Sequence, residues 1–179
     1  MDEGEIRKAI FEGRGVVEIH EMDPNTSVST IKTIRLEMIE EGLPIVSPFG
    51  LVQERVNKDD LHEWRIVTIC CLMNRTHARQ VRPMMRDLFV TWPTPEAMVV
   101  AGPGLEVMLK TLGLVKKRAN VLRKMSEDLV KGVPIERCFG VGHYAHDSLE
   151  IFVNARTNFV PTDRFLVKYV DWVNEGRRT

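Results

Sequence analysis

Residue types that could bind or activate a ligand are concentrated between residues 139 and 163. Gly140 and Gly142 are separated by one residue, so the chain can adopt positive φ there, turn tightly and leave backbone N–H groups free. The apolar spacing after this turn predicts a helix over 143–156, and free amides at a helix N-terminus form a site for phosphate. Asp163 follows an X-Pro step, where it could begin another helix. The segment therefore combines an anion-binding turn with the carboxylate of Asp163.

The elements that would position this segment are all helices. Residues 60–74 are apolar on nearly every face, which predicts a buried central helix whose start Asp59 and Asp60 can cap. Pro83 should kink or shorten the helix that follows. Since no segment shows strand alternation, the expected fold class is all-α, a bundle with short loops. Helical spacing and start or stop residues predict further helices over 29–41, 76–92, from 94, from 103, over 116–130 and over 163–174.

Composition limits the classes of protein to consider. With 179 residues, of which 44% are hydrophobic, the chain can bury one full core as a single domain. We expect that domain to span 47–179 and residues 1–46 to form an N-terminal arm of unknown role. No apolar run approaches the roughly 20 residues that span a bilayer, and the acidic start shows no signal-peptide pattern, so no membrane partner is expected. Three cysteines, of which Cys70 and Cys71 are adjacent, make no disulfide framework and indicate a reducing compartment.

The cysteines and histidines also lack the spacing of metal ligands. No Cys-x-x-Cys pair occurs, the five histidines share no ligand spacing, and nothing after Asp163 could hold an iron–sulfur cluster. We therefore expect no metal and no cofactor, apart from a monovalent cation that the glycine turn could accept.

Charge is divided unevenly along the chain. Residues 1–60 carry 13 acidic and 7 basic side chains, whereas residues 61–179 carry 12 acidic and 18 basic ones. Each basic side chain taken alone fits a solvated helix face, but two clusters beside an anion-binding turn favour a polyanionic partner. The clusters are Arg75, Arg79, Arg82 and Arg86, and Lys110, Lys116, Lys117, Arg118, Arg123 and Lys124.

Six ordered motifs between residues 47 and 173 carry a resemblance to a known family. They are Ser-Pro-Phe-Gly-Leu-Val-Gln-Glu (47–54), Leu-Met-Asn-Arg-Thr (72–76), Trp-Pro-Thr-Pro-Glu-Ala (92–97), Leu-Gly-Leu with Lys-Arg-Ala (112–114 and 117–119), Gly-Val-Gly-His-Tyr (140–144) with Asp-Ser (147–148), and Pro-Thr-Asp (161–163) with Lys-Tyr-Val-Asp-Trp (168–172). The chain resembles the catalytic domain of the methyl-CpG-binding-domain thymine DNA glycosylases, within the helix-hairpin-helix DNA glycosylase superfamily. The resemblance implies a compact helix-hairpin-helix glycosylase domain. It includes neither the methyl-CpG-binding domain nor residues 1–46.

The resemblance also implies roles in catalysis. Asp163 occupies the position of the catalytic aspartate. Tyr144 stands where bifunctional relatives place a Schiff-base lysine, which implies release of the base without cleavage of the backbone. Val52, Gln53 and Tyr144 match positions lining the pocket for the flipped base. Without the resemblance, Asp163 is a helix cap by default, Tyr144 a half-buried core residue and Gln53 a loop residue.

A second set of matching residues would contact the duplex. Arg75 matches the residue that fills the gap left by a flipped base, and Leu114, or Leu112, matches a wedge at the opposite base. Taken alone, Arg75 would be a surface charge. One departure touches the edge of the pocket and leaves the base preference open, because Arg-Phe (164–165) replaces a His-Lys pair. The remaining expected DNA contacts are Lys116, Lys117, Arg118, Gly140, Gly142 and His143, the last of which replaces a lysine of the mammalian relative.

The expected function is that of a monofunctional DNA glycosylase in base excision repair. It would flip thymine, uracil or a 5-substituted uracil, opposite guanine, out of the duplex and hydrolyse the N-glycosidic bond. Two alternatives stay open: a preference for a hypermodified pyrimidine, and a non-catalytic helix-hairpin-helix DNA-binding protein that would not need Asp163. We expect a monomer that acts on double-stranded DNA inside the cell, in the nucleus if eukaryotic and in the cytoplasm if prokaryotic or viral.

Overall fold

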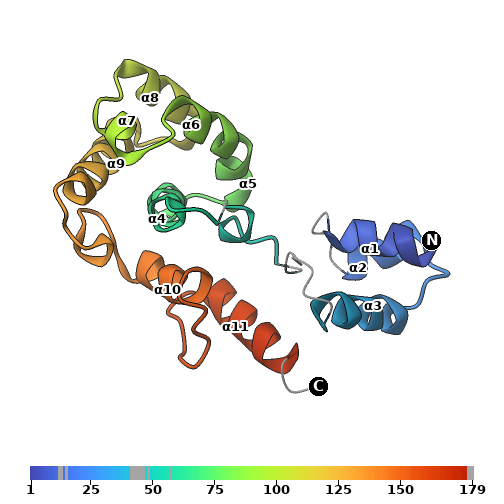
Figure 1. Cartoon of the computed structure of the whole chain (residues 1–179). Helices are drawn as coiled ribbons and strands as arrows, with labels where there is room; N and C mark the ends of the chain where they lie inside the picture. Colours follow the sequence, from blue (N-terminus) through green and yellow to red (C-terminus); the bar gives the residue numbers. More distant parts are fainter. Residues whose placement is uncertain (12–13, 15, 41–46, 48, 57, 177–179) are drawn as a thin grey trace. The chain divides into compact units, whose positions relative to one another are not determined.

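The computed structural model describes residues 1–11, 14, 16–40, 47, 49–56 and 58–176 (Figure 1). Within these ranges the regular elements are helices and no strand occurs, which confirms the all-α prediction. The chain divides into two compact units, the first made of Met1–Arg55 with Lys168–Thr179 and the second of Val56–Val167. The expected boundary after residue 46 falls outside the described residues and stays a prediction.

Three helices of the first unit close around an apolar cluster of their own. They are α1 (Glu3–Phe11), α2 (Val16–Met22) and α3 (Val28–Glu40). Ile6 and Ile10 lie one turn apart on α1, and Ile31 and Ile34 share a face of α3, so each helix turns one apolar stripe inward. Only α3 had been expected, as a helix over 29–41. The full cluster is Ile6, Ala9, Ile10, Ile19, Ile31, Ile34 and Met38.

The first unit also holds the short 3-10 turn η1 (Gln53–Arg55) and the end of α11 (Arg164–Gly176). Trp172 of α11 contacts two aromatic rings and one cation of the same unit. The ring of Phe49 meets it edge-on with centroids 6.5 Å apart, and the Arg35 guanidinium lies 5.8 Å from its centroid. These contacts give the buried charge of Arg35 a π-face in place of water.

The second unit is built around α4 (His62–Met73), which packs against α9 (Val115–Val130) and α10 (His143–Phe152). Trp64, Ile66 and Leu72 are at most 1% exposed, and the Trp64 indole donates a 3.0 Å hydrogen bond to the Ser126 hydroxyl of α9. The prediction of a buried central helix is therefore confirmed. The remaining elements of this unit are α5 (Ala78–Val81), η2 (Arg82–Met84), α6 (Met85–Thr91), α7 (Pro95–Val99), α8 (Pro103–Met108), η3 (Leu109–Leu112) and η4 (Ile135–Arg137).

Prolines set several of the helix boundaries in this unit. The helix expected over 76–92 is divided into α5, η2 and α6, with Pro83 in the 3-10 turn between them. A proline lacks the amide hydrogen that the helix ladder needs and crowds the preceding turn, which accounts for the division. Thr94 caps α7 as predicted, because its Oγ1 accepts a 3.3 Å hydrogen bond from the amide of Ala97, and Pro95 is the first helical residue.

Candidate active site

The glycine turn before α10 is held against two other helices. Gly140 has φ of +83°, and a Cβ atom added to it would lie 2.7 Å from Cγ1 of Val121 on α9, so only glycine fits. The Cys71 thiol of α4 donates to the carbonyl of Gly140 at 3.8 Å. The amide of Phe139 donates to Oδ2 of Asp128 on α9 at 2.8 Å. The turn is thus fixed by packing and by hydrogen bonds from both sides.

The turn delivers the chain directly into the N-terminus of α10. Gly142 is the N-cap residue, has an extended backbone and offers no side chain to cap the helix. Helix geometry gives the first-turn amides of α10 no acceptor within the helix, and Gly140, Gly142 and His143 are exposed. Lys124 adds positive charge nearby, since its ammonium lies 5.0 Å from the Phe139 ring centroid. The helix begins where the sequence predicts but ends at Phe152, earlier than the expected residue 156.

Asp163 is the N-cap of α11. Its Oδ1 accepts hydrogen bonds from the amides of Phe165 at 2.8 Å and Leu166 at 3.1 Å. Among the described residues no partner contacts Oδ2, and the side chain is partly exposed. The carboxylate is therefore oriented by one oxygen and keeps the other for a ligand. This geometry is compatible with both roles considered for Asp163, helix cap and reactive group.

A second carboxylate joins α10 to the segment that carries Asp163. Oδ2 of Asp147 accepts hydrogen bonds from both the amide and the hydroxyl of Thr162, each at 2.7 Å. Tyr144 precedes Asp147 by three residues, so it lies on the same face of α10, the face that the residue before Asp163 contacts. The sequence did not predict the hydrogen bonds between Asp147 and Thr162, because no local pattern links two residues 15 positions apart.

Three exposed residues have positive φ without being glycine: Arg75, Leu114 and Ala155. Arg75 has φ of +58° and follows α4, and Leu114 has φ of +47° and follows η3. This conformation costs L-residues about 1–2 kcal/mol, and such strain is concentrated at functional sites. Leu114 is 59% exposed, whereas Leu112 is 8% exposed with its side chain in the core. We therefore discard Leu112 as a wedge candidate and retain Leu114.

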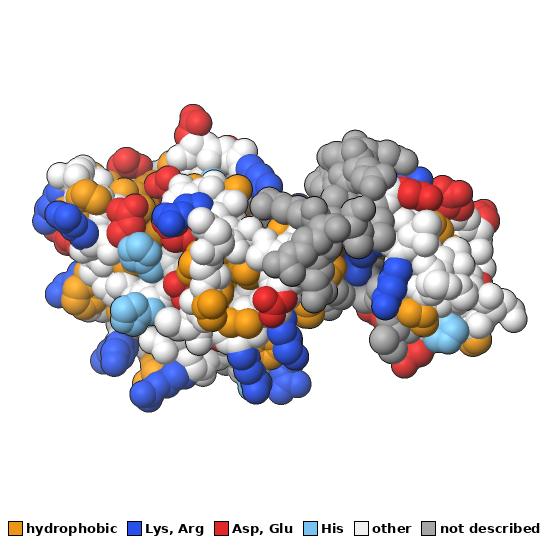
Figure 2. Space-filling model, turned by 90° about the horizontal axis from the view of Figure 1, so that it is seen from below, with side chains coloured by type: hydrophobic (Ala, Val, Ile, Leu, Met, Phe, Trp, Pro, Cys, Tyr) orange, Lys and Arg blue, Asp and Glu red, His pale blue; other side chains and the backbone are white. Residues whose placement is uncertain are grey.

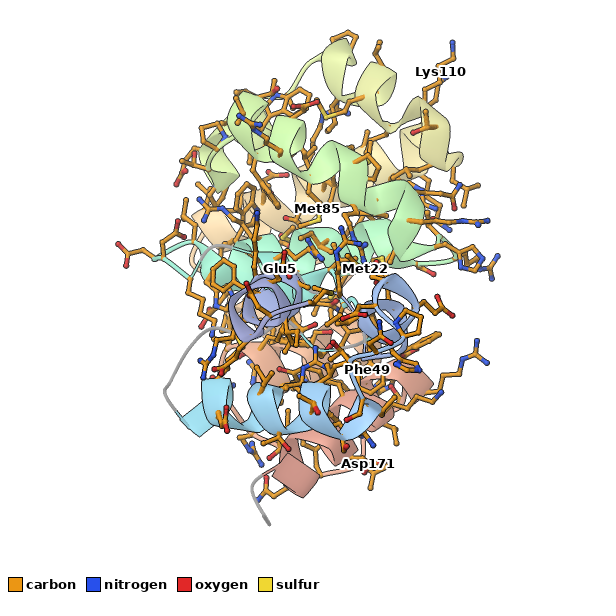
Figure 3. All side chains as sticks on the ribbon, turned by 90° about the vertical axis from the view of Figure 1, so that its right-hand side faces the viewer. Glu5, Met22, Phe49, Met85, Lys110 and Asp171 are labelled. Atoms are coloured by element: carbon orange, nitrogen blue, oxygen red, sulfur yellow. The ribbon has the colours of Figure 1, made fainter. Side chains whose placement is uncertain are left out.

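Arg118 is placed differently from the two lysines before it. Lys116 and Lys117 are exposed, whereas Arg118 is only 6% exposed and its guanidinium donates to groups of this chain. Burial lowers the pKa of the Arg118 guanidinium from its usual value. The expectation that Arg118 contacts phosphate directly is therefore corrected. Side chains of Lys and Arg still gather along the lower left edge of the face in Figure 2, and Lys110 extends outward in Figure 3.

Val52 and Gln53, the other expected pocket residues, belong to the first unit. Val52 is fully buried, and Gln53 begins η1 and is 1% exposed. The adjoining Glu54 accepts hydrogen bonds from the amide and hydroxyl of Ser47, each at 2.7 Å, and burial raises its pKa. The contact of Gln53 with a base stays a prediction.

The described residues offer neither a cluster of metal ligands nor a membrane-spanning helix. No group of three or more His, Cys, Asp or Glu side chains within the described ranges is arranged to hold a metal ion. Among the same residues, no helix is both long and apolar enough to cross a membrane. The expectation of a monovalent cation at the glycine turn is untested.

The all-α fold is compatible with that of all-α DNA glycosylases, and two curated proteins are similar to this chain. One is the methyl-CpG-binding domain protein 4-like protein of Arabidopsis thaliana, 34% identical over 136 residues that cover 73% of this chain and 30% of that protein. The other is the thymine/uracil-DNA glycosylase of Pyrobaculum aerophilum, 26% identical over 121 residues that cover 62% of this chain and 52% of that protein. The chain thus spans less than a third of the first relative and about half of the second. No family model matches the chain.

Proposed function

We propose that this chain is a monofunctional DNA glycosylase that releases thymine, uracil or a 5-substituted uracil opposite guanine from double-stranded DNA. The observation that carries the proposal is the position of Asp163, whose Oδ2 is left for a ligand beside the helix that opens at the anion-binding turn. The names of the two relatives, one of which is a thymine/uracil-DNA glycosylase, support the reaction and the substrate class. We propose further that the protein acts as a monomer on DNA inside the cell.

The chemical step would take place on the sugar of a base that has left the helix. Flipping costs a few kcal/mol, and least for a mismatched base, which favours a target opposite guanine. As the bond between C1′ and the base breaks, its electron pair leaves with the base and positive charge develops on the sugar. Oδ2 of Asp163 would stabilise that charge and orient a water molecule. The water supplies hydroxide to C1′ and a proton, by way of the carboxylate, to the departing base.

The rest of the site would hold the duplex in register with that carboxylate. Amides of the glycine turn and of the first turn of α10 would bind a backbone phosphate, and Lys116 and Lys117 would add charge that is not sequence-specific. Arg75 would fill the gap that the flipped base leaves, and Leu114 would enter beside the opposite base. Gln53 offers both a donor and an acceptor, which suits the edge of a pyrimidine.

Replacement of Asp163 by Asn is the direct test of the proposed reaction. Duplexes with T:G, U:G and 5-hydroxymethyluracil:G pairs are incubated with protein, and alkali then cleaves any abasic site. We expect Asp163→Asn to abolish base release and to leave duplex affinity within about threefold, because the carboxylate acts on the transition state and the turn holds the phosphates.

The matched control for that variant is Asp171→Asn, since Asp171 is an exposed aspartate on the same helix (Figure 3). It should release bases at the wild-type rate. Normal turnover by Asp163→Asn would remove this residue from the mechanism. Wild-type protein that binds all three duplexes and releases no base would favour a non-catalytic DNA-binding protein, and release restricted to a hypermodified pyrimidine would favour the other alternative.

The absence of a lyase step follows from Tyr144, whose phenol cannot form the imine that a bifunctional enzyme needs. Product strands should therefore stay intact until alkali is added, and borohydride should trap no covalent complex with substrate DNA. Two lysines near the site in sequence offer the test for an unexpected amine. Lys131 pairs with Glu127 at 2.5 Å, and Lys168 is exposed on α11. A trapped complex that disappears on Lys168→Ala would contradict the monofunctional assignment.

A further inference from the structure

Arg118 is a buried cation without a carboxylate partner among the described residues. It lies in the first turn of α9 and is 6% exposed. Burial of a guanidinium without a counter-ion is costly unless its donors are satisfied by other groups. The acceptors of the Arg118 guanidinium therefore indicate which parts of the protein this buried side chain holds in place.

All three guanidinium nitrogens donate to two loops, or to the helix end that leads into each loop, and the two loops are far apart in the sequence. One loop follows α4 and the other follows η3. A single planar fork is the geometry that can reach several carbonyls in two directions at once. Nε donates to the Gly113 carbonyl at 3.0 Å, Nη1 to the Leu72 carbonyl at 2.8 Å, and Nη2 to the Asn74 carbonyl at 3.1 Å, the Leu112 carbonyl at 3.4 Å and the Thr76 hydroxyl.

These acceptors flank Arg75 and Leu114, two of the three non-glycine residues with positive φ among the described residues. Asn74 and Thr76 are the residues immediately before and after Arg75, and Gly113 immediately precedes Leu114. Arg75 and Leu114 are both exposed and both have positive φ. One guanidinium therefore fixes the backbone on which both candidate inserting side chains stand.

We propose that Arg118 is a positioning residue that couples the two loops, so that Arg75 and Leu114 enter the duplex together at one base pair. The inference rests on the proposed function. Filling a gap in one strand and wedging the other are productive only when both act at the same step of the duplex, so the distance between the two side chains has to be kept. Arg118 supplies that constraint from the protein interior and touches neither the base nor the phosphates.

Arg118→Lys tests the coupling, because an ammonium keeps the charge but cannot direct five donors along a planar fork. Base release from a T:G duplex is measured under single-turnover conditions for wild type, Arg118→Lys, Arg75→Ala and the double variant. We expect each single variant to slow release about tenfold and the double variant to be slower by less than about twofold again, because residues that act as one unit are non-additive.

The matched control is Arg123→Lys on the same helix. Arg123 also ties a distant loop, donating to the Ala101 and Gly102 carbonyls at 2.7 and 3.0 Å and pairing with Glu106 at 2.8 Å. The loop that Arg123 contacts carries no exposed residue with positive φ. Arg123→Lys should therefore lower thermal stability about as much as Arg118→Lys does, without slowing base release. Its effect on base release should be additive with that of Arg75→Ala.

Hydrogen exchange gives a readout that does not depend on DNA. In Arg118→Lys, the amides of residues 75–76 and 114–115 should exchange faster together, and in Arg123→Lys they should not. Unchanged exchange at both loops, or additive effects of Arg118→Lys and Arg75→Ala on release, would overturn the inference alone. Wild-type protein that releases no base from any duplex would instead reject the proposed function, whatever the exchange data show.

Discussion

At the scale of single residues, the same side-chain type can have opposite roles a few positions apart. Lys116, Lys117 and Arg118 form one basic run in the sequence, which predicts three phosphate contacts, yet the third residue is buried and binds backbone carbonyls. Nothing in the run marks it, because three of its five acceptors lie 42 to 46 positions away on and after α4. The position of Asp163 after an X-Pro step, by contrast, predicts its place at a helix start.

A comparison of alanine substitutions at Gly140 and Gly132 separates two costs of adding a Cβ atom: the strain of positive φ and the steric clash with Val121. Gly140→Ala adds a Cβ atom 2.7 Å from Val121 at φ of +83°, whereas Gly132→Ala adds one at φ of +81° with nothing within 4 Å. We expect Gly132→Ala to lower the free energy of unfolding by about 1 kcal/mol and Gly140→Ala by about 2–4 kcal/mol. Urea unfolding measures both, and equal losses would mean that the contact with Val121 can relax.

At the scale of helices, periodicity identifies the elements better than their ends. The central helix over 60–74 was predictable because it is apolar on nearly every face, and the basic helix over 116–130 because its apolar residues recur every three or four positions; α4 and α9 occupy nearly these ranges. α1 and α2 are short, so too few repeats of the pattern were present. The loops after α4 and η3 were beyond prediction, since positive φ at a non-glycine residue has no sequence signal.

The exposed start of α9 should dominate binding that does not depend on sequence. Lys116→Ala with Lys117→Ala should weaken matched and mismatched duplexes alike and make the dependence of affinity on salt concentration shallower, because fewer counter-ions are displaced. Lys131→Ala at the other end of the helix is the control, since Lys131 already pairs with Glu127. Anisotropy titrations at several salt concentrations measure the slope, and a loss confined to the mismatched duplex would mean that these lysines read bases.

At the scale of the whole molecule, the chain folds as two compact units. The absence of strand alternation in the sequence was sufficient to predict the all-α class. The division of the chain into two compact units was not predictable from the sequence. Residues 168–176 belong to the first unit although they are distant from the rest of it in sequence. Such long-range membership depends on tertiary contacts such as that of Trp172 with Phe49, which no window of sequence contains.

All three cysteines lie in the second unit and can report on its unfolding. Cys70 and Cys138 are at most 4% exposed, and burial raises the pKa of Cys71 to about 12. Because the thiolate is the reactive form, native labelling by a thiol reagent should accelerate about tenfold per pH unit between pH 7 and 10, while an exposed thiol introduced by Val160→Cys should level off above about pH 9. Urea should release all three thiols at once, and fast native labelling at pH 7 would contradict this burial.

The strained backbones of Arg75 and Leu114 have a consequence for anyone who evolves this protein in the laboratory. Glycine or asparagine would occupy either position at less conformational cost, and neither wild-type side chain contributes much buried area in return. A library screened only for heat resistance should therefore enrich glycine and asparagine at these two positions. The most heat-resistant clones would then lack the two side chains that are proposed to enter the duplex. Such a screen therefore has to select for base release at every round.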